Sequence, residues 1–285
     1  MKLLKAIFLP AIFCLSLLSC KTKVDNIQLS RTDDAAVLFG FLNPDADTIT
    51  VALSLAKGVS THKEKIINFA DLENAEVQLM HNGQSVNLAF LKVVENQGWS
   101  SGNRLFVFYA LRSQFPVLPG ETYSVSARNG DIFELKAITT VPSEDFDFDY
   151  EVSGPFHTPD WRPEYKVAVT VRDPGKGIGF MRTVAQVKKL NYSYNSMDEI
   201  TVPEHQSDGS IKYNYSFFLE TDNGEEEVIL NISNVSESYY RYMQSVEKGD
   251  GESHNPFAEP TSMYTNIEGG YGVFAALCVK SKRVK

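Results

Sequence analysis

Two residues near the N-terminus have the types and the order needed for cleavage and lipid attachment. Ser19 is a small residue that follows Leu17 and Leu18, and Cys20 comes directly after it. A peptidase that cuts before a diacylglyceryl-cysteine needs a small side chain at the residue before the cut. The sequence therefore predicts cleavage after Ser19 and lipidation of the Cys20 thiol. An ordinary secretory signal with an incidental Cys20 is the alternative.

The residues before this pair have the pattern of a secretory signal. Lys2 and Lys5 give a basic start, and residues 6–19 carry no charge. This apolar run is shorter than the about 20 residues of a membrane-spanning helix, and it suits the apolar region of a signal peptide. We expect residues 1–19 to be the signal peptide and 20–31 an acylated tether. Two or more acyl chains on Cys20 would anchor the chain stably in lipid.

Cysteine usage leaves one thiol for the folded part of the chain. Of three Cys, Cys14 leaves with the signal and Cys20 is acylated, so only Cys278 remains. The mature chain therefore forms no internal disulfide. Cys278 lies within the apolar run 273–279, which predicts a buried and unreactive thiol.

Both tryptophans stand in polar, loop-like surroundings. Trp99 lies within residues 96–102, which are rich in Asn, Gly and Ser, and Trp161 lies between Pro159 and Pro163. An exposed aromatic ring on a loop can bind a sugar or another flat ligand, whereas a local packing role is the alternative. Trp99 and Trp161 are therefore the candidate ligand contacts.

Carboxylates alternate with aromatic residues over 145–151. Clustered carboxylate oxygens bind calcium, but this stretch lacks the glycine and the terminal glutamate of an EF-hand loop. On a strand, the alternation places Asp145, Asp147 and Asp149 together on a solvated face. None of the five His is spaced as a metal-binding pair on a helix. We therefore predict no metal site and no cofactor.

Little in the sequence points to catalysis. It contains no H-E-x-x-H motif, and Gly175–Gly179 is neither a phosphate loop nor a dinucleotide fingerprint but a mobile turn. Paired carboxylates for glycoside hydrolysis stay open, because 36 acidic residues allow many pairs. We expect a protein that is not an enzyme, with a glycan hydrolase as the catalytic alternative.

Composition and charge narrow the class of protein. The chain is 43% hydrophobic and 22% charged, which is typical of a globular protein. Its formal net charge of -9 argues against nucleic acid as a partner, because binding to phosphates needs a basic face. At 285 residues the length favours two domains.

Strand patterns dominate the chain after the tether. Apolar and polar residues alternate over 48–55, 165–172 and 211–219, a period of two that is typical of antiparallel strands with one buried face. We expect the strand at 211–219 to form a hairpin with 228–232 through Asn223-Gly224. Further Asn-Gly or Asp-Gly turns are expected at residues 82–83, 129–130 and 208–209.

One amphipathic helix is expected near 235–248. Asn234 is its predicted cap, with Glu237 as the capping-box acid, and Gly249 is its predicted end. Its apolar stripe is formed by Val235, Tyr239, Met243 and Val246.

The sequence therefore predicts an all-β, mainly antiparallel fold with two domains. Pro142 precedes the acidic stretch and marks a plausible boundary. We expect an N-terminal β-sandwich over 32–142 and a C-terminal β domain with the helix over 143–285.

Several stretches carry a resemblance to a known family. These are residues 37–42, 51–56, 228–243, 255–260 and 265–274. Together with the lipidation signal, they resemble the domain-of-unknown-function family 4249, which consists of lipoproteins of the Bacteroidota. The resemblance covers essentially the whole mature chain. Residues 75–83 and 119–123 look like an immunoglobulin-like or carboxypeptidase-regulatory-like sandwich.

The resemblance implies an outer-membrane lipoprotein, often encoded beside TonB-dependent transporters, and it supplies no catalytic residue. Residues 21–25 lack the acidic character that often marks surface export, so the periplasmic and cell-surface faces both stay open. The glycines at 269, 270 and 272 predict tight backbone turns before a closing strand. The leading hypothesis is a non-enzymatic accessory or ligand-binding subunit of a TonB-dependent transport system. A surface structural or adhesion lipoprotein is the alternative.

Overall fold

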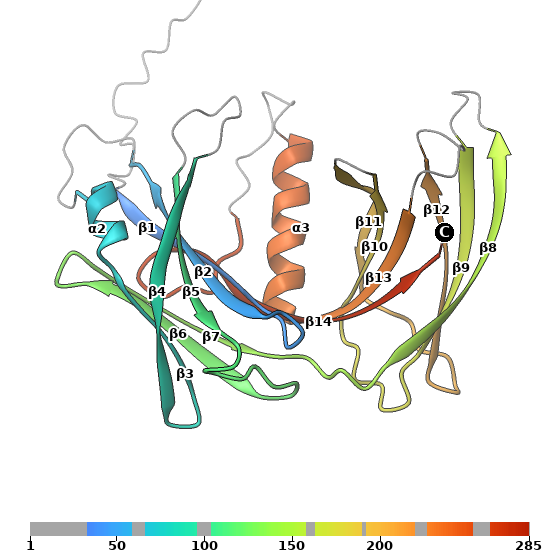
Figure 1. Ribbon diagram of the computed structural model, residues 1–285, viewed down its shortest axis with the longest axis horizontal. Helices are drawn as coiled ribbons and strands as arrows, with labels where there is room; N and C mark the ends of the chain where they lie inside the picture. The colour runs from blue at the N-terminus through green and yellow to red at the C-terminus, as the bar shows by residue number, and fades with distance from the viewer. Residues whose placement is uncertain are drawn as a thin grey trace, which may run out of the picture.

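The computed structural model describes residues 33–58, 66–95, 104–157, 163–189, 192–219, 227–252 and 263–284. Figure 1 shows two lobes of strands with a helix standing between them. The elements of the first lobe are β1 (Ala35–Leu42), β2 (Thr48–Ala56), α2 (Phe69–Glu73), β3 (Glu76–His81), β4 (Gln84–Glu95), β5 (Arg104–Leu111), β6 (Thr122–Asn129) and β7 (Phe133–Thr140). The second lobe contains β8 (Asp147–His157), β9 (Pro163–Arg172), β10 (Met181–Lys188), β11 (Ser193–Thr201), β12 (Ser210–Phe218) and β13 (Glu227–Val235). Helix α3 (Glu237–Glu252) and strand β14 (Tyr271–Arg283) follow.

The described strands form two sheets. The larger sheet has the order β11-β10-β13-β14-β1-β2-β5-β4-β3-β6-β7, and the smaller has the order β12-β9-β8. Neighbouring strands run antiparallel except for β1 and β14, which run parallel. The predicted all-β, mainly antiparallel fold is thus confirmed. None of the helices in the described ranges is long and apolar enough to cross a membrane.

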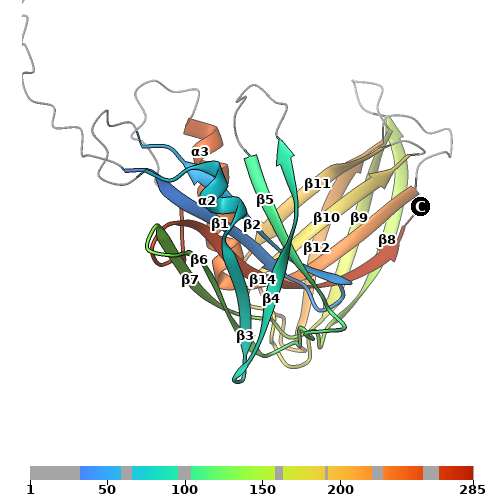
Figure 2. The same ribbon diagram turned by 60° about the vertical axis from the view of Figure 1, so that its left-hand side comes forward.

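Strand β14 belongs to both lobes. Its residues 271–276 pair with β1, and its residues 277–283 pair with β13. Figure 2 shows this strand running from one lobe into the other. The domain boundary at residue 142 stays a prediction. The strand β14, which comes after this boundary in the sequence, pairs with β1 of the first lobe.

Alternating side chains build the core of each lobe. Strand β7 buries every second residue, from Phe133 to Thr139, and its other side chains are exposed. The predicted turn at Asn82-Gly83 joins β3 to β4, and both residues have positive φ, which a tight two-residue hairpin requires. Strand β9 likewise buries Tyr165, Val167, Val169 and Val171, so it follows the period-two pattern that the sequence predicts.

The predicted hairpin between 211–219 and 228–232 is wrong. β12 pairs with β9, whereas β13 pairs with β10 and β14. The two strands lie in different sheets that face each other across the core, where the Tyr215 hydroxyl of β12 lies 3.1 Å from the Thr183 Oγ1 of β10. An alternating pattern shows that a strand has a buried face, but it does not name the neighbour with which the strand pairs.

Helix α3 begins later than predicted and has a different cap. Asn234 lies in β13, where its buried side chain donates to the Ser143 carbonyl at 3.0 Å. Ser236 caps the helix, because its hydroxyl accepts from the backbone N–H of Tyr239 at 3.4 Å. The helix also continues through Gly249 to Glu252.

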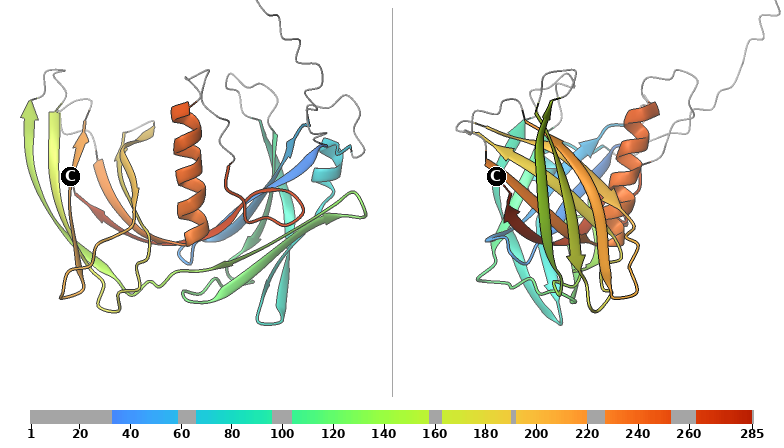
Figure 3. Two further views of the ribbon diagram at one scale, coloured as in Figure 1. Left: turned by 180° about the vertical axis from the view of Figure 1, so that it is seen from behind. Right: turned by 90° about the vertical axis from the view of Figure 1, so that its right-hand side faces the viewer.

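The helix packs on the sheet where the two lobes meet. Tyr239 and Tyr242 contact Phe41 and Phe39 of β1 edge to face, at ring-centre distances of 5.5 and 6.2 Å. Val273 and Ala275 of β14 are fully buried beneath the helix. Figure 3 shows α3 in front of the central strands when the molecule is seen from behind.

Candidate functional site

The residues that the sequence singled out for modification and ligand contact lie outside the described ranges. These are Ser19, Cys20, Trp99 and Trp161. The elements that flank the two tryptophans belong to different lobes, with β4 and β5 on either side of Trp99 and β8 and β9 on either side of Trp161 (Figure 1).

One sequence match to a catalytic signature has to be weighed against the expected absence of catalysis. Residues 98–102 read Gly-Trp-Ser-Ser-Gly, which has the G-x-S-x-G spacing of a nucleophile elbow. An elbow joins a strand to a helix. Here the described elements on either side of the match are the strands β4 and β5, which pair antiparallel. The flanking elements therefore lack the context that this signature needs.

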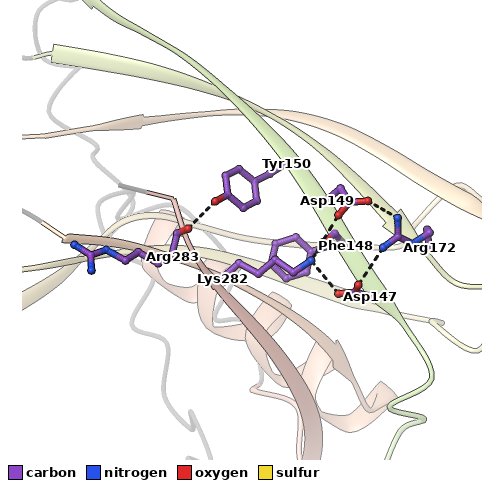
Figure 4. Close-up of polar contacts among 7 residues, drawn as sticks. All are labelled: Asp147, Phe148, Asp149, Tyr150, Arg172, Lys282 and Arg283. Carbon is purple, nitrogen blue, oxygen red and sulfur yellow. Dashed lines mark hydrogen bonds and ion pairs between the residues drawn. The ribbon is translucent and has the colours of Figure 1, made fainter.

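The acidic stretch at the start of β8 forms a charge network with two neighbouring strands (Figure 4). Arg172 of β9 donates to Asp147 at 3.0 Å and also to Asp149. Lys282 of β14 lies 3.1 Å from Asp147 and 3.7 Å from Asp149. The predicted solvated face is confirmed for Asp147 and Asp149, and each carboxylate on it is balanced by a cation.

Lys282 also ties β14 to the edge of the smaller sheet. Its ammonium donates to the Phe148 carbonyl and lies 4.8 Å from the centre of the Phe148 ring. The Tyr150 hydroxyl donates to the Arg283 carbonyl at 2.6 Å. These contacts join β8 to β14, although the two strands belong to different sheets (Figure 4).

The network lowers the proton affinity of the Asp147 carboxylate. The pKa of Asp147 lies below its usual value because the backbone N–H of Phe148 and the ammonium of Lys282 donate to the carboxylate. The Asp149 carboxylate in turn raises the pKa of Arg172. A general acid in glycoside hydrolysis needs a raised pKa, whereas the pKa of Asp147 is lowered.

This network borders a hollow of about 470 Å³ at the end of the second lobe. Its walls include Glu144, Asp145, Arg172, Asp173 and Asp208. The described residues contain no group of three or more His, Cys, Asp or Glu placed to hold a metal ion. The hollow is acidic, and Arg172 within it compensates part of that charge.

Asp173 anchors the glycine-rich turn beside the hollow. Its side chain is 2% exposed and accepts from the backbone N–H groups of Gly177 and Ile178, at 2.9 and 2.8 Å. His205 Nε2 lies 2.7 Å from the same carboxylate. A buried carboxylate is stable only when it is paired and hydrogen-bonded. The Asp173–His205 pair therefore stabilises this turn. The two residues are 32 positions apart, so the sequence alone does not predict that they pair.

A second hollow, of about 510 Å³, lies where the two lobes meet beside the start of α3. Asn234, Arg241 and Asn266 contribute polar side chains to it. Each is engaged, because Asn234 donates to Ser143, Arg241 pairs with Glu237 at 2.5 Å, and Asn266 bonds the backbone of Phe274. Asn234 and Asn266 thus tie together segments that meet at this junction, whereas the Arg241–Glu237 pair lies within α3.

Arg182 links the helix to the second lobe. It donates to Asp198 at 2.8 and 2.5 Å and to the Tyr239 hydroxyl at 2.7 Å. Burial raises the pKa of Tyr239, so this phenol stays protonated and accepts from the guanidinium. The arrangement fixes α3 against β10 and β11.

Cys278 is buried, as predicted. Its side chain is 2% exposed, and its thiol donates to the Pro142 carbonyl at 3.2 Å. Burial raises the pKa of this thiol to about 12, so it is not activated as a nucleophile.

Sequence reasoning missed an exposed apolar stretch in β4. Phe90, Leu91, Val93 and Val94 are between 38% and 49% exposed. The signal was present, because residues 89–94 break the alternation of apolar and polar residues that a half-buried strand requires.

No curated protein matches this chain. A family model described as Domain of unknown function (DUF4249) matches residues 22–283, which include every described strand and both described helices. Because this match spans most of the sequence, the chain belongs to the family Domain of unknown function (DUF4249).

Proposed function

We propose that this protein is an outer-membrane lipoprotein, anchored through acylated Cys20, that serves as a non-enzymatic accessory or ligand-binding subunit of a TonB-dependent transport system. The lipidation signal at Ser19-Cys20 supports the anchor. The resemblance to a lipoprotein family supports the outer-membrane location and the role with a TonB-dependent transporter.

One structural observation carries the non-enzymatic part of the proposal. Three pairs of ionisable side chains lie around the two hollows, namely Arg172–Asp147, His205–Asp173 and Arg241–Glu237. A catalytic acid or base needs a tuned pKa and access to substrate. These pairs instead join strands, turns and the helix, which favours a scaffold that presents its surface to a partner.

The anchor is tested by metabolic labelling with radioactive palmitate. The wild-type chain should take up label and remain with the membrane after a carbonate wash. Cys20→Ser should lose the label and accumulate with its signal uncut. Cys14→Ser is the matched control, because it removes a signal-peptide thiol and should leave labelling unchanged. Label that persists in Cys20→Ser would refute lipidation at this residue.

The transporter is tested by purifying the tagged lipoprotein from its native membrane in mild detergent. We expect a TonB-dependent transporter in stoichiometric amount, identified by mass spectrometry. The same purification after chemical cross-linking in whole cells covers short-lived contacts. Recovery without any transporter in both experiments would overturn the proposal and favour the adhesion alternative, which a deletion strain tests through cell adhesion and envelope integrity.

The glycan hydrolase alternative is tested directly. Purified protein is incubated with envelope and host-type polysaccharides, and released reducing ends are measured. We expect no turnover. Turnover that falls with single Asp or Glu substitutions would establish a hydrolase and end the non-enzymatic reading.

A further inference from the structure

The second half of β4 has a neighbour on one side only. β3 pairs with β4 as far as Leu88, whereas β5 pairs with β4 from Ala89 to Glu95. Among the described residues, no strand pairs with the other side of residues 89–95. We call this side of residues 89–95 the open edge. Figure 2 shows this half of β4 beside β5 in the first lobe.

The open edge is apolar on both faces. Phe90 and Val93 are 38% and 39% exposed, and Leu91 and Val94 are 49% and 38% exposed. Every residue from Ala89 to Glu95 is exposed. Soluble proteins rarely leave a strand edge both unpaired and apolar, because its free N–H and C=O groups attract another chain. Such an edge binds an extended polypeptide by adding it as a further strand.

Charge on the open edge specifies the occupant. Glu95 is neutralised by Arg104 of β5 at 3.0 Å. Lys92 has no ion pair with any described residue, so it is the uncompensated charge of this stretch. A carboxylate on the added strand would pair with Lys92, and opposite charges on facing strands stabilise a sheet while like charges destabilise it.

The same lysine disfavours a second copy of this chain. Lys92 lies at the midpoint of residues 89–95. Antiparallel pairing of the open edge with its own copy about this midpoint would place one Lys92 against the other. The pairing with β5 also shifts its register between Phe90 and Lys92, and a bulge of this kind twists an edge away from flat stacking. Pairing between two open edges is thus disfavoured, whereas pairing with one short acidic strand is not.

We propose that the open edge of β4 binds an extended segment of a different polypeptide, which adds as a strand beside residues 89–95 and places an acidic side chain against Lys92. This inference rests on the pairing, exposure and charge of β4, and it holds whether or not the partner is a transporter.

The test uses the full-length lipoprotein in detergent and two synthetic peptides. Both peptides alternate valine and threonine, and they differ only at the central residue, which is aspartate in one and lysine in the other. Fluorescence anisotropy measures their dissociation constants. We expect the aspartate peptide to bind about threefold or more tightly than the lysine peptide. Hydrogen exchange should show new protection at residues 89–95.

Charge reversal supplies the decisive comparison. Lys92→Glu should invert the preference, so that the lysine peptide binds more tightly. Lys212→Glu is the matched control, because Lys212 is an exposed lysine of β12 in the other lobe, and this variant should keep the wild-type preference. Absence of binding, equal binding of the two peptides, or protection elsewhere would overturn the proposal. Self-association that protects residues 89–95 without any peptide would also overturn it, in favour of a second copy.

Discussion

Gly272 lies opposite Leu38 in the parallel pair of β14 and β1, so close that a Cβ at Gly272 would be 2.0 Å from the Leu38 carbonyl oxygen. The backbone of Gly272 also has a φ of +108°, which residues other than glycine rarely adopt. A Cβ at Gly270 would likewise lie 2.3 Å from the Ala36 carbonyl oxygen. Gly270 and Gly272 are therefore explained by the close approach of this segment to β1.

Gly272→Ala should destabilise the whole protein. Strain at positive φ and the clash with Leu38 together suggest a loss of about 2–6 kcal/mol in the free energy of unfolding. Urea unfolding followed by tryptophan fluorescence measures this loss. Because β14 pairs with both lobes, we expect one shifted transition for the entire chain.

Gly249→Ala is the control for this substitution. Gly249 lies within α3, and a Cβ there would meet no atom within 4 Å beyond its chain neighbours and the backbone of its own helix. Alanine should therefore stabilise the helix, by about 0.5–1 kcal/mol. Equal changes in the free energy of unfolding for Gly272→Ala and Gly249→Ala would contradict the role given to Gly272.

The sequence predicts where strands lie and which of their residues are buried, but it does not predict which strands pair. Alternation at residues 165–172 predicted β9, and the apolar run 273–279 predicted the burial of Cys278. Nothing local indicated that β12 and β13 lie in different sheets, because each strand's pattern is satisfied by any partner that buries the same face.

The same division applies to the charged groups. The sequence indicated that Asp147 and Asp149 share a solvated face, but Lys282, which pairs with both, is more than 130 positions away. The helix cap was misplaced by two positions, from Ser236 to Asn234, because both residue types favour that position and only the register of β13 decides between them.

Asp147 should make stability depend on acid pH. Its pKa is lowered in the folded protein, so the folded state binds the proton less readily than the unfolded chain, whose aspartate pKa is about 3.9. The resulting stabilisation is complete above that value and is lost as the pH falls through the folded-state pKa. Urea unfolding between about pH 6 and pH 3 should therefore show a shallower loss in Asp147→Asn than in the wild type. Asp131→Asn, which removes an exposed turn carboxylate, should keep the wild-type slope.

Cys278 should react with thiol reagents only when the protein unfolds. In a soluble form that begins at Lys21, Cys278 is the only thiol. Its pKa of about 12 means that the folded protein holds roughly a thousandfold less thiolate at pH 8 than a free cysteine. We expect slow reaction with a disulfide reagent in buffer and rapid reaction in urea. Prompt reaction of the folded protein would show that the thiol is accessible.

Ser236 and Asn234 should have separable effects, although only two positions divide them. Ser236 caps α3 and also accepts from the backbone N–H of Ala276 at 3.1 Å, so Ser236→Ala removes a helix cap and a tie to β14. We expect a loss of about 1–2 kcal/mol and faster hydrogen exchange at Tyr239 and Tyr240.

Asn234→Ala should leave the first turn of α3 protected, because its amide bonds the carbonyls of Ser143 and Gly177 and not the helix. Its cost should be about 1–3 kcal/mol, since two carbonyl groups near the junction of the lobes lose their donor. Faster exchange should then appear around residues 143 and 177. Loss of protection in α3 upon Asn234→Ala, with none upon Ser236→Ala, would restore Asn234 as the cap and contradict the register of β13.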